Sequence, residues 1–169
     1  MFALSKYPNC TVYSYEPVYS NFKQLAKNRD LNRSKKMFCF NMAVCGHGGK
    51  IDICLDTTDS FSTSATIIAS KDKNIKSIEV PCSSLSDVFK ENKIDKCDLL
   101  KLDCEGAEYE ILYNAPEEVI LKIDQMAIEV HQGKNEHENL ESLKDFLTKS
   151  DFHLFQLKDK PHMLWAYRP

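Results

Sequence analysis

The chain has 169 residues, with 22 basic and 25 acidic side chains and a net charge of −3. This length predicts one domain over residues 1–169, and the charge balance lacks the basic excess of a nucleic-acid-binding protein. No run of about 18 apolar residues occurs, so we expect no membrane span. The first seven residues lack the basic flank and apolar stretch of a signal peptide. These features favour a cytoplasmic globular protein that binds neither nucleic acid nor membrane.

Seven cysteines are scattered singly, without a C-x-x-C pair, and most of them lie in apolar runs. There a cysteine behaves as a small buried hydrophobe. We therefore interpret them as reduced thiols of a cytoplasmic protein rather than as disulfides or zinc ligands. Four histidines show no partner at ligand spacing and are interpreted as surface residues: His47, His137, His153 and His162.

Strands and helices are expected to alternate along the chain. In the first half we predict a strand over 11–15, a helix over 21–31, a strand over 36–44, a glycine-rich turn over 45–49, a strand over 50–55, a strand over 76–81 and a helix over 84–92. In the second half we predict a strand over 97–103, a helix over 107–114, a strand over 124–131, a helix over 138–149 and strands over 152–157 and 162–167. This alternation predicts a mostly parallel α/β sheet with helices on both faces. The last two strands are joined by a few residues, so they must be antiparallel.

Two acidic residues follow the strand predicted over 97–103. The ends of parallel strands point toward the crevice where open α/β sheets bind ligands, so Asp103 and Glu105 can reach one site. Gly106 would let the backbone turn closely into the next helix. The alternatives are that Asp103 caps this helix and that Glu105 is stabilised by the helix dipole.

Glu129 and His131 lie two residues apart at the end of another predicted strand, so they share a face. Histidine is the usual general base near neutral pH, and a carboxylate nearby can hold its tautomer. The alternatives are a hydrogen-bonded surface histidine and a divalent metal held by Asp103, Glu129 and His131. Our assignment of roles uses no metal.

Glu16 follows the strand over 11–15, where its carboxylate could accept both ribose hydroxyls of an adenosyl group. Asn41 offers an amide that both donates and accepts hydrogen bonds, and Ala43 offers a small surface against a purine. The alternatives are a solvated acid at a strand end and ordinary packing. The polar segment over 57–66, which contains Phe61, is either a substrate loop or an insertion without a role.

Four blocks in order resemble FkbM-type methyltransferases, which use S-adenosylmethionine. The blocks are Val12–Pro17 with Asn21 and Leu25, Asn41–Val44 with the glycine-rich turn after it, Leu100–Glu108 with Ile111 and Leu112, and Ile128–His131. The resemblance implies a Rossmann-like class I sheet, mostly parallel, with a C-terminal antiparallel strand pair. It implies S-adenosylmethionine as the cofactor and a hydroxyl of a small molecule or sugar as the methyl acceptor. It also implies catalytic and cofactor-binding roles. The catalytic residues are then His131, Asp103 and Glu129, and the cofactor-binding residues are Glu16, Pro17, Asn41, Ala43, Asp103 and Glu105.

The chain departs from the pattern of this family at its N-terminus. In these enzymes the first strand ends in a glycine-rich loop around the methionine end of the cofactor, and nothing before Val12 matches it. The domain is therefore expected to be N-terminally truncated, with the strands over 11–15 and 97–103 either adjacent or separated by an unfilled gap. A non-catalytic remnant or adenosine-binding module is the alternative function. A weaker alternative is a metal-dependent hydrolase built on Asp103, Glu105, Glu129 and His131.

Overall fold

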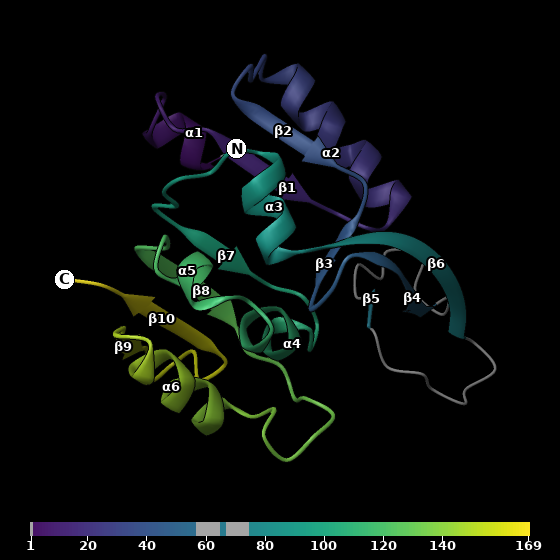
Figure 1. Ribbon diagram of the computed structural model, residues 1–169. Helices are drawn as coiled ribbons and strands as arrows, with labels where there is room; N and C mark the ends of the chain where they lie inside the picture. Colours follow the sequence, from purple (N-terminus) through teal and green to yellow (C-terminus); the bar gives the residue numbers. More distant parts are fainter. Residues whose placement is uncertain (1, 57–64, 67–74) are drawn as a thin grey trace.

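Helices and strands alternate in the computed structural model, which describes residues 2–56, 65–66 and 75–169 (Figure 1). The first half contains α1 (Phe2–Lys6), β1 (Val12–Tyr15), α2 (Tyr19–Leu31), β2 (Met37–Phe40), β3 (Ala43–Cys45), β4 (Gly49–Asp56), β5 (Ala65–Thr66) and β6 (Ile75–Ser84). The second half contains α3 (Leu85–Glu91), β7 (Leu100–Leu102), α4 (Glu108–Tyr113), α5 (Glu117–Ile120), β8 (Gln125–Glu129), α6 (Leu140–Lys149), β9 (His153–Gln156) and β10 (Met163–Tyr167). The segment over 57–66 with Phe61 lies largely outside the described residues.

The described strands form three hydrogen-bonded sheets. The first pairs β1 with β2 in parallel. The second has the order β7-β8-β10-β9, in which β7 and β8 are parallel and β10 is antiparallel to both of its neighbours. The third has the order β3-β6-β4-β5, with β3 and β6 parallel and the other pairs antiparallel. The fold is thus mixed α/β, and the predicted antiparallel C-terminal strand pair is confirmed. The predicted mostly parallel sheet is wrong for the described strands, because three of their seven pairs are parallel and four are antiparallel.

β1 and β7 are not hydrogen-bonded to each other. Among the described strands, β1 pairs only with β2 and β7 pairs only with β8. Their arrowheads nevertheless point to the same side of the molecule, and α3 crosses in front of β1 in this view (Figure 1). The end of α3 is joined to β1, because Asn92 at that end donates from Nδ2 to the Tyr15 hydroxyl at 2.9 Å. Of the two predicted arrangements, direct pairing of these strands is therefore wrong, and an unfilled gap between them stays a prediction.

The single strand predicted over 36–44 is wrong. The chain forms β2 and β3 there, and these strands belong to different sheets. Asn41 lies between them, and its Nδ2 donates to the carbonyl oxygens of Glu16 and Pro17 at 3.0 and 2.9 Å. These bonds fix the segment between β2 and β3 to the residues that follow β1. The backbone passes from the first sheet to the third at this point. The sequence carries one sign of the break, Asn41, a residue type common in turns, within an otherwise apolar run.

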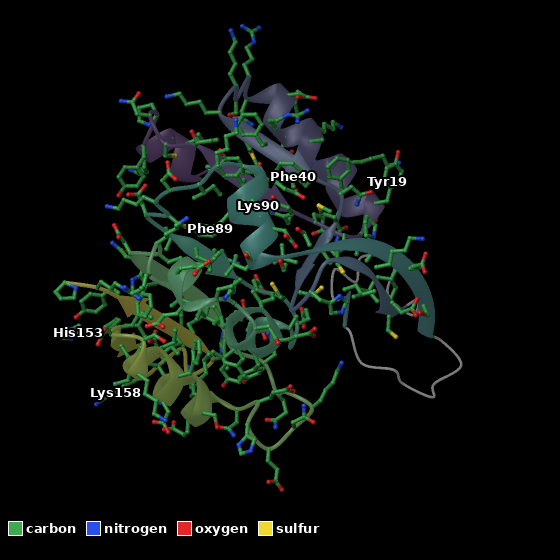
Figure 2. The ribbon with its side chains drawn as sticks, in the orientation of Figure 1. Tyr19, Phe40, Phe89, Lys90, His153 and Lys158 are labelled. Atoms are coloured by element: carbon green, nitrogen blue, oxygen red, sulfur yellow. The ribbon has the colours of Figure 1, made fainter. Side chains whose placement is uncertain are left out.

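The main hydrophobic core lies among the sheet of β7, β8 and β10 and the helices α3 to α6. The predicted apolar face of α6 contributes Leu143 and Leu147, which are fully buried. On α3, Phe89 is buried in this core, whereas the next residue, Lys90, is exposed to solvent (Figure 2). A second, smaller core lies within the third sheet and comprises Ala43, Cys45, Ile53, Val80 and Cys82.

The predicted start of the helix after residue 84 is confirmed. The Ser84 hydroxyl oxygen accepts a hydrogen bond from the backbone amide of Asp87 at 3.0 Å, and its proton is donated to the Asp87 carboxylate at 2.7 Å. Because β6 ends at this residue, the cap fixes the direction in which α3 leaves the third sheet. Within the described part of the chain, no helix is long and apolar enough to cross a membrane.

Candidate active site

The turn between β7 and α4 has a left-handed backbone at two successive residues. Glu105 has φ of 51° and Gly106 has φ of 101°. Gly106 adopts this conformation without the steric cost that a Cβ atom would add. The Gly106 backbone also lies close to the segment after β8, because a Cβ atom there would be 3.6 Å from the carbonyl oxygen of Gln132. The turn thus brings the acids after β7 next to the residues that follow β8.

Glu108, the first residue of α4, is the buried centre of this turn. Its side chain is fully buried. Oε1 accepts a hydrogen bond from the Cys104 amide at 2.8 Å, and Oε2 accepts one from the Gly106 amide at 3.0 Å. Oε1 also lies 2.9 Å from Nδ1 of His131. One carboxylate therefore holds both the backbone of the turn and the imidazole of the neighbouring strand end.

Glu108 fixes the tautomer of His131. A carboxylate can only accept, so Nδ1 of His131 carries the proton and Nε2 keeps its lone pair. The Tyr109 hydroxyl donates to the backbone carbonyl of His131 at 2.7 Å, so adjacent residues of α4 hold both the ring and the backbone. Nε2 lies 3.6 Å from the Glu105 carboxylate, and the His131 side chain is 26% exposed. The basic nitrogen is therefore oriented and still accessible.

The surroundings of His131 raise its pKa above the ordinary value of 6.5. Burial of the ring lowers the pKa, but the hydrogen bond and charge of Glu108, together with the charges of Glu105 and Glu129, outweigh this effect. The acidic groups stabilise the imidazolium form. His131 is consequently a stronger base than a free histidine, and it becomes available as a base only above its raised pKa.

The structure brings Asp103, Glu129 and His131 together, as the sequence analysis predicts. One donor atom from each lies within 4.8 Å of the others, close enough for the three to surround a divalent cation. Asp103 is also paired with Lys101, whose Nζ lies 2.7 Å from Oδ2. Asp103 does not cap α4, since the residue before that helix is Ala107 and no side-chain cap is formed.

Glu16, Pro17 and Asn41 form a second group, at the end of β1. Glu16 Oε1 accepts a hydrogen bond from the Val18 amide at 2.8 Å, and Asn41 holds the carbonyls of Glu16 and Pro17. Burial raises the pKa of Glu16, opposed by hydrogen bonds from Val18 and Asn21. A carboxylate has about four acceptor positions, so roughly two remain for a ligand.

The two groups lie at the same edge of the strands. Glu16 follows β1 and Asp103 follows β7, and both arrowheads point to that side (Figure 1). Ala43 differs from the other predicted cofactor residues, because it is 6% exposed within the smaller core. Its methyl group packs among β3, β6 and β4, and its contact with a purine stays a prediction.

Sequence reasoning missed Glu108. The residue belongs to the Leu100–Glu108 block, but an acid at a helix start is typical of a solvated residue near the helix dipole. Its burial depends on the conformation of the turn at 105–106 and on the approach of His131. The one usable signal was the histidine itself, because an oriented imidazole requires a partner for its second nitrogen.

The chain is a mixed α/β protein whose carboxylates and oriented histidine lie at the ends of the parallel strands β7 and β8, the place where open α/β sheets commonly bind ligands. The model of one family, described as the methyltransferase FkbM domain, matches residues 2–156. The chain therefore belongs to the FkbM methyltransferase family, and the resemblance stated from the sequence is confirmed.

A curated protein with a related segment is the AMB antimetabolite synthetase AmbE of Pseudomonas aeruginosa. The two are 24% identical over 125 residues, which is 73% of this chain but 6% of AmbE. The chain thus spans a small part of that protein's length. No solved structure matches the chain significantly.

Proposed function

We propose that the chain is an S-adenosylmethionine-dependent methyltransferase that methylates a hydroxyl group of a small molecule or sugar. The observation that carries this proposal is the His131 imidazole, whose Nδ1 is held by the buried Glu108 in a chain of the FkbM family. We also infer a Rossmann-like class I fold. It is supported by the parallel pairs β1–β2 and β7–β8 and by the antiparallel strands β10 and β9.

The residues at the end of β1 fit the adenosyl part of the cofactor. The acceptor positions left on Glu16 suit the two ribose hydroxyls, while Asn41 keeps the Glu16–Pro17 backbone in place. Ala43 would lie toward the purine. Asp103 and Glu105, at the end of β7, would lie toward the positively charged methionine end. When bound, S-adenosylmethionine supplies a methyl group activated by its sulfonium.

His131 acts as the general base in this proposal. Nε2 takes the proton of the acceptor hydroxyl as the oxygen becomes nucleophilic, and Glu108 holds the ring in the required tautomer. Asp103 and Glu129 accept hydrogen bonds from the acceptor and orient it. The charge of Glu105 stabilises the imidazolium that forms. The proton then leaves to solvent, to which the ring is partly open.

Cofactor binding is tested by the substitution Glu16→Ala. Hydrogen bonds to a charged acceptor contribute roughly 1.5–3 kcal/mol each, so the loss of two should weaken S-adenosylhomocysteine binding about tenfold or more. Isothermal titration calorimetry measures both affinities, and Glu118→Ala, on an exposed residue of α5, is the matched control. Equal affinity of the wild type and Glu16→Ala would contradict the ribose assignment.

The reaction is tested by transfer of a labelled methyl group to a panel of hydroxylated acceptors. General bases typically contribute about 10²–10⁴-fold, so His131→Ala should reduce turnover by that factor with cofactor affinity nearly unchanged. His153→Ala, at an exposed histidine on β9, is the control.

Two outcomes of this experiment would change the proposal. Full activity of His131→Ala would contradict the base assignment, and a chelator would then show whether a metal ion at Asp103 and Glu129 activates the hydroxyl. A wild-type chain that binds the cofactor but methylates no acceptor would be an adenosine-binding module instead.

A further inference from the structure

Two thiols and one imidazole lie close together on the third sheet, away from the acids that follow β7 and β8. They belong to Cys45 at the end of β3, His47 in the following turn and Cys82 on β6. One donor atom from each lies within 4.8 Å of the other two. Both cysteines are buried, whereas His47 is exposed, so the cluster has one side open to solvent. His47 is a surface residue, as the sequence predicts, but the fold brings two thiols close to it that its spacing in the sequence did not indicate.

The strand pairing explains why the two thiols meet. β3 and β6 are parallel, with Ala43 opposite Cys82 and Cys45 opposite Ser84. Side chains two residues apart share a face, so Cys45 and Cys82 are diagonal neighbours on one side of the sheet. Their Cα atoms are then about 8 Å apart, given strands about 4.8 Å apart and a rise of about 3.3 Å per residue. Because a disulfide needs Cα atoms closer than about 7 Å, this geometry does not suit one without backbone movement.

A carbonyl oxygen currently occupies the space between the thiols. Both S–H groups approach the backbone carbonyl of His47, with Cys45 Sγ at 3.0 Å and Cys82 Sγ at 3.5 Å. The thiols thus converge on one point instead of packing apart in the apolar core. A tetrahedral zinc ion, with bonds of about 2.0–2.3 Å, places neighbouring donor atoms about 3.5–3.8 Å apart. A zinc ion would therefore require the donors to move closer together and the His47 carbonyl oxygen to turn away from the space between the thiols.

The His47 ring is held in a form that can bind a metal. Its Nδ1 lies 3.0 Å from the carbonyl oxygen of Gly48. A carbonyl only accepts, so Nδ1 carries the proton and Nε2 keeps its lone pair. Metal-binding histidines commonly donate their other ring N–H to a backbone carbonyl in this way. This contact is an observation independent of the paired thiols, and it leaves Nε2 as the ring nitrogen that can bind a metal.

The turn that carries His47 packs closely against α4 and the residue that follows it. The Gly46 amide donates to Glu110 Oε1 at 3.3 Å. A Cβ atom at Gly46 would lie 2.6 Å from Cγ of Glu110 and 2.8 Å from Nδ2 of Asn114, so the two surfaces are in close contact. The donors on this turn are therefore held in place rather than free to separate.

We propose that Cys45, His47 and Cys82 bind one zinc ion, with a fourth position open to water. Two thiolates and an imidazole are ligands that zinc prefers, and three protein ligands with an open position are a known zinc arrangement. Binding releases the two thiol protons to solvent and involves no oxidation or reduction. The ion would connect the end of β3 to β6. This proposal does not depend on the methyltransferase activity.

The test uses the full 169-residue chain, purified in reductant, stripped of metal and then titrated with zinc or with Co²⁺ as a spectroscopic probe. We expect one equivalent of zinc and a thiolate-to-cobalt charge-transfer band. Cys45→Ser and Cys82→Ser should each weaken the band, their double variant should abolish it, and His47→Ala should lower affinity about a hundredfold or more. His47 is exposed, so this variant should fold even if a buried cysteine variant does not.

The matched control is Cys54→Ser, on β4 and outside the cluster, which should bind zinc like the wild type. Zinc should raise the melting temperature of the wild type and of Cys54→Ser but not that of the Cys45→Ser, Cys82→Ser double variant. The proposal is overturned if the reduced wild type binds no zinc, if His47→Ala binds as tightly as the wild type, or if the double variant retains the ion.

Discussion

The substitution Glu108→Gln tests the buried carboxylate. It replaces one acceptor oxygen by an NH₂ group, so the Cys104 amide, the Gly106 amide or the His131 ring must lose its acceptor. A buried donor without a partner costs about 1–3 kcal/mol, and we expect the free energy of unfolding to fall by that amount. Urea unfolding measures the change, with Glu118→Gln at an exposed position as the control. A loss no larger than that of the control would contradict the role of Glu108.

The raised pKa of His131 predicts a particular pH dependence of stability. A group whose pKa is higher in the folded state binds its proton more tightly there, so protonation favours folding. Its contribution is fully present below the ordinary value of 6.5 and is lost as the pH rises through the raised pKa of the folded state. The stability of the wild type relative to His131→Asn should therefore fall over this range.

Urea unfolding at a series of pH values measures this difference, and an NMR titration of the His131 ring gives its pKa directly. A relative stability that is constant or rises with pH above 6.5 would show that the acidic neighbours do not outweigh burial of the ring.

At the residue scale, the sequence predicted the acids and histidine that follow the strands but not the groups that orient them. Asp103, Glu129 and His131 could be placed together because each follows an apolar strand. Glu108 could not be recognised as buried, because its environment comes from a turn with left-handed backbone at 105–106. The partner of His47 is Cys82, and only the pairing of β3 with β6 joins them.

At the scale of elements, the cap of α3 makes a measurable contribution. Ser84→Ala removes the oxygen that accepts from the Asp87 amide, and loss of such a cap costs about 0.5–2 kcal/mol. Thermal and urea unfolding should show this loss, whereas Thr148→Ala, at an exposed position inside α6, should change stability little. A Ser84→Ala variant as stable as the wild type would indicate that water replaces the cap.

Elements with a clear start signal or periodicity were predicted well, and those defined by tertiary contacts were not. The cap of α3, the apolar face of α6 and the pairing of β9 with β10 followed from local sequence. The break between β2 and β3 did not, because Asn41 ends the strand through contacts with a segment 24 or 25 residues earlier. The short helix α5 was not predicted, since it comprises only Glu117–Ile120.

At the scale of the whole molecule, the edge of β1 that pairs with no described strand predicts uneven hydrogen exchange. The amides of Val12 and Glu16 donate to carbonyls of the segment that forms β2. Because amides alternate in direction along a strand, those of Tyr13 and Tyr15 face the open edge. They should exchange on the order of tenfold faster or more than the Ser14 amide between them. Exchange measured by NMR tests this, and equal protection of the three amides would mean that the edge is paired in solution.

The same edge bears on how the chain behaves when it is concentrated. β1 has the uncharged sequence Val12–Tyr15, whose tyrosines stack on Phe38 and Phe40 of β2. Natural sheets usually protect a free edge with charge, proline or a bulge, and this strand has none of these between its ends. Two molecules that meet along β1 can satisfy each other's amides, so self-association should grow with concentration and time. The time for which a concentrated solution of the protein stays monomeric would then be limited by strand pairing between molecules, even where each molecule stays folded.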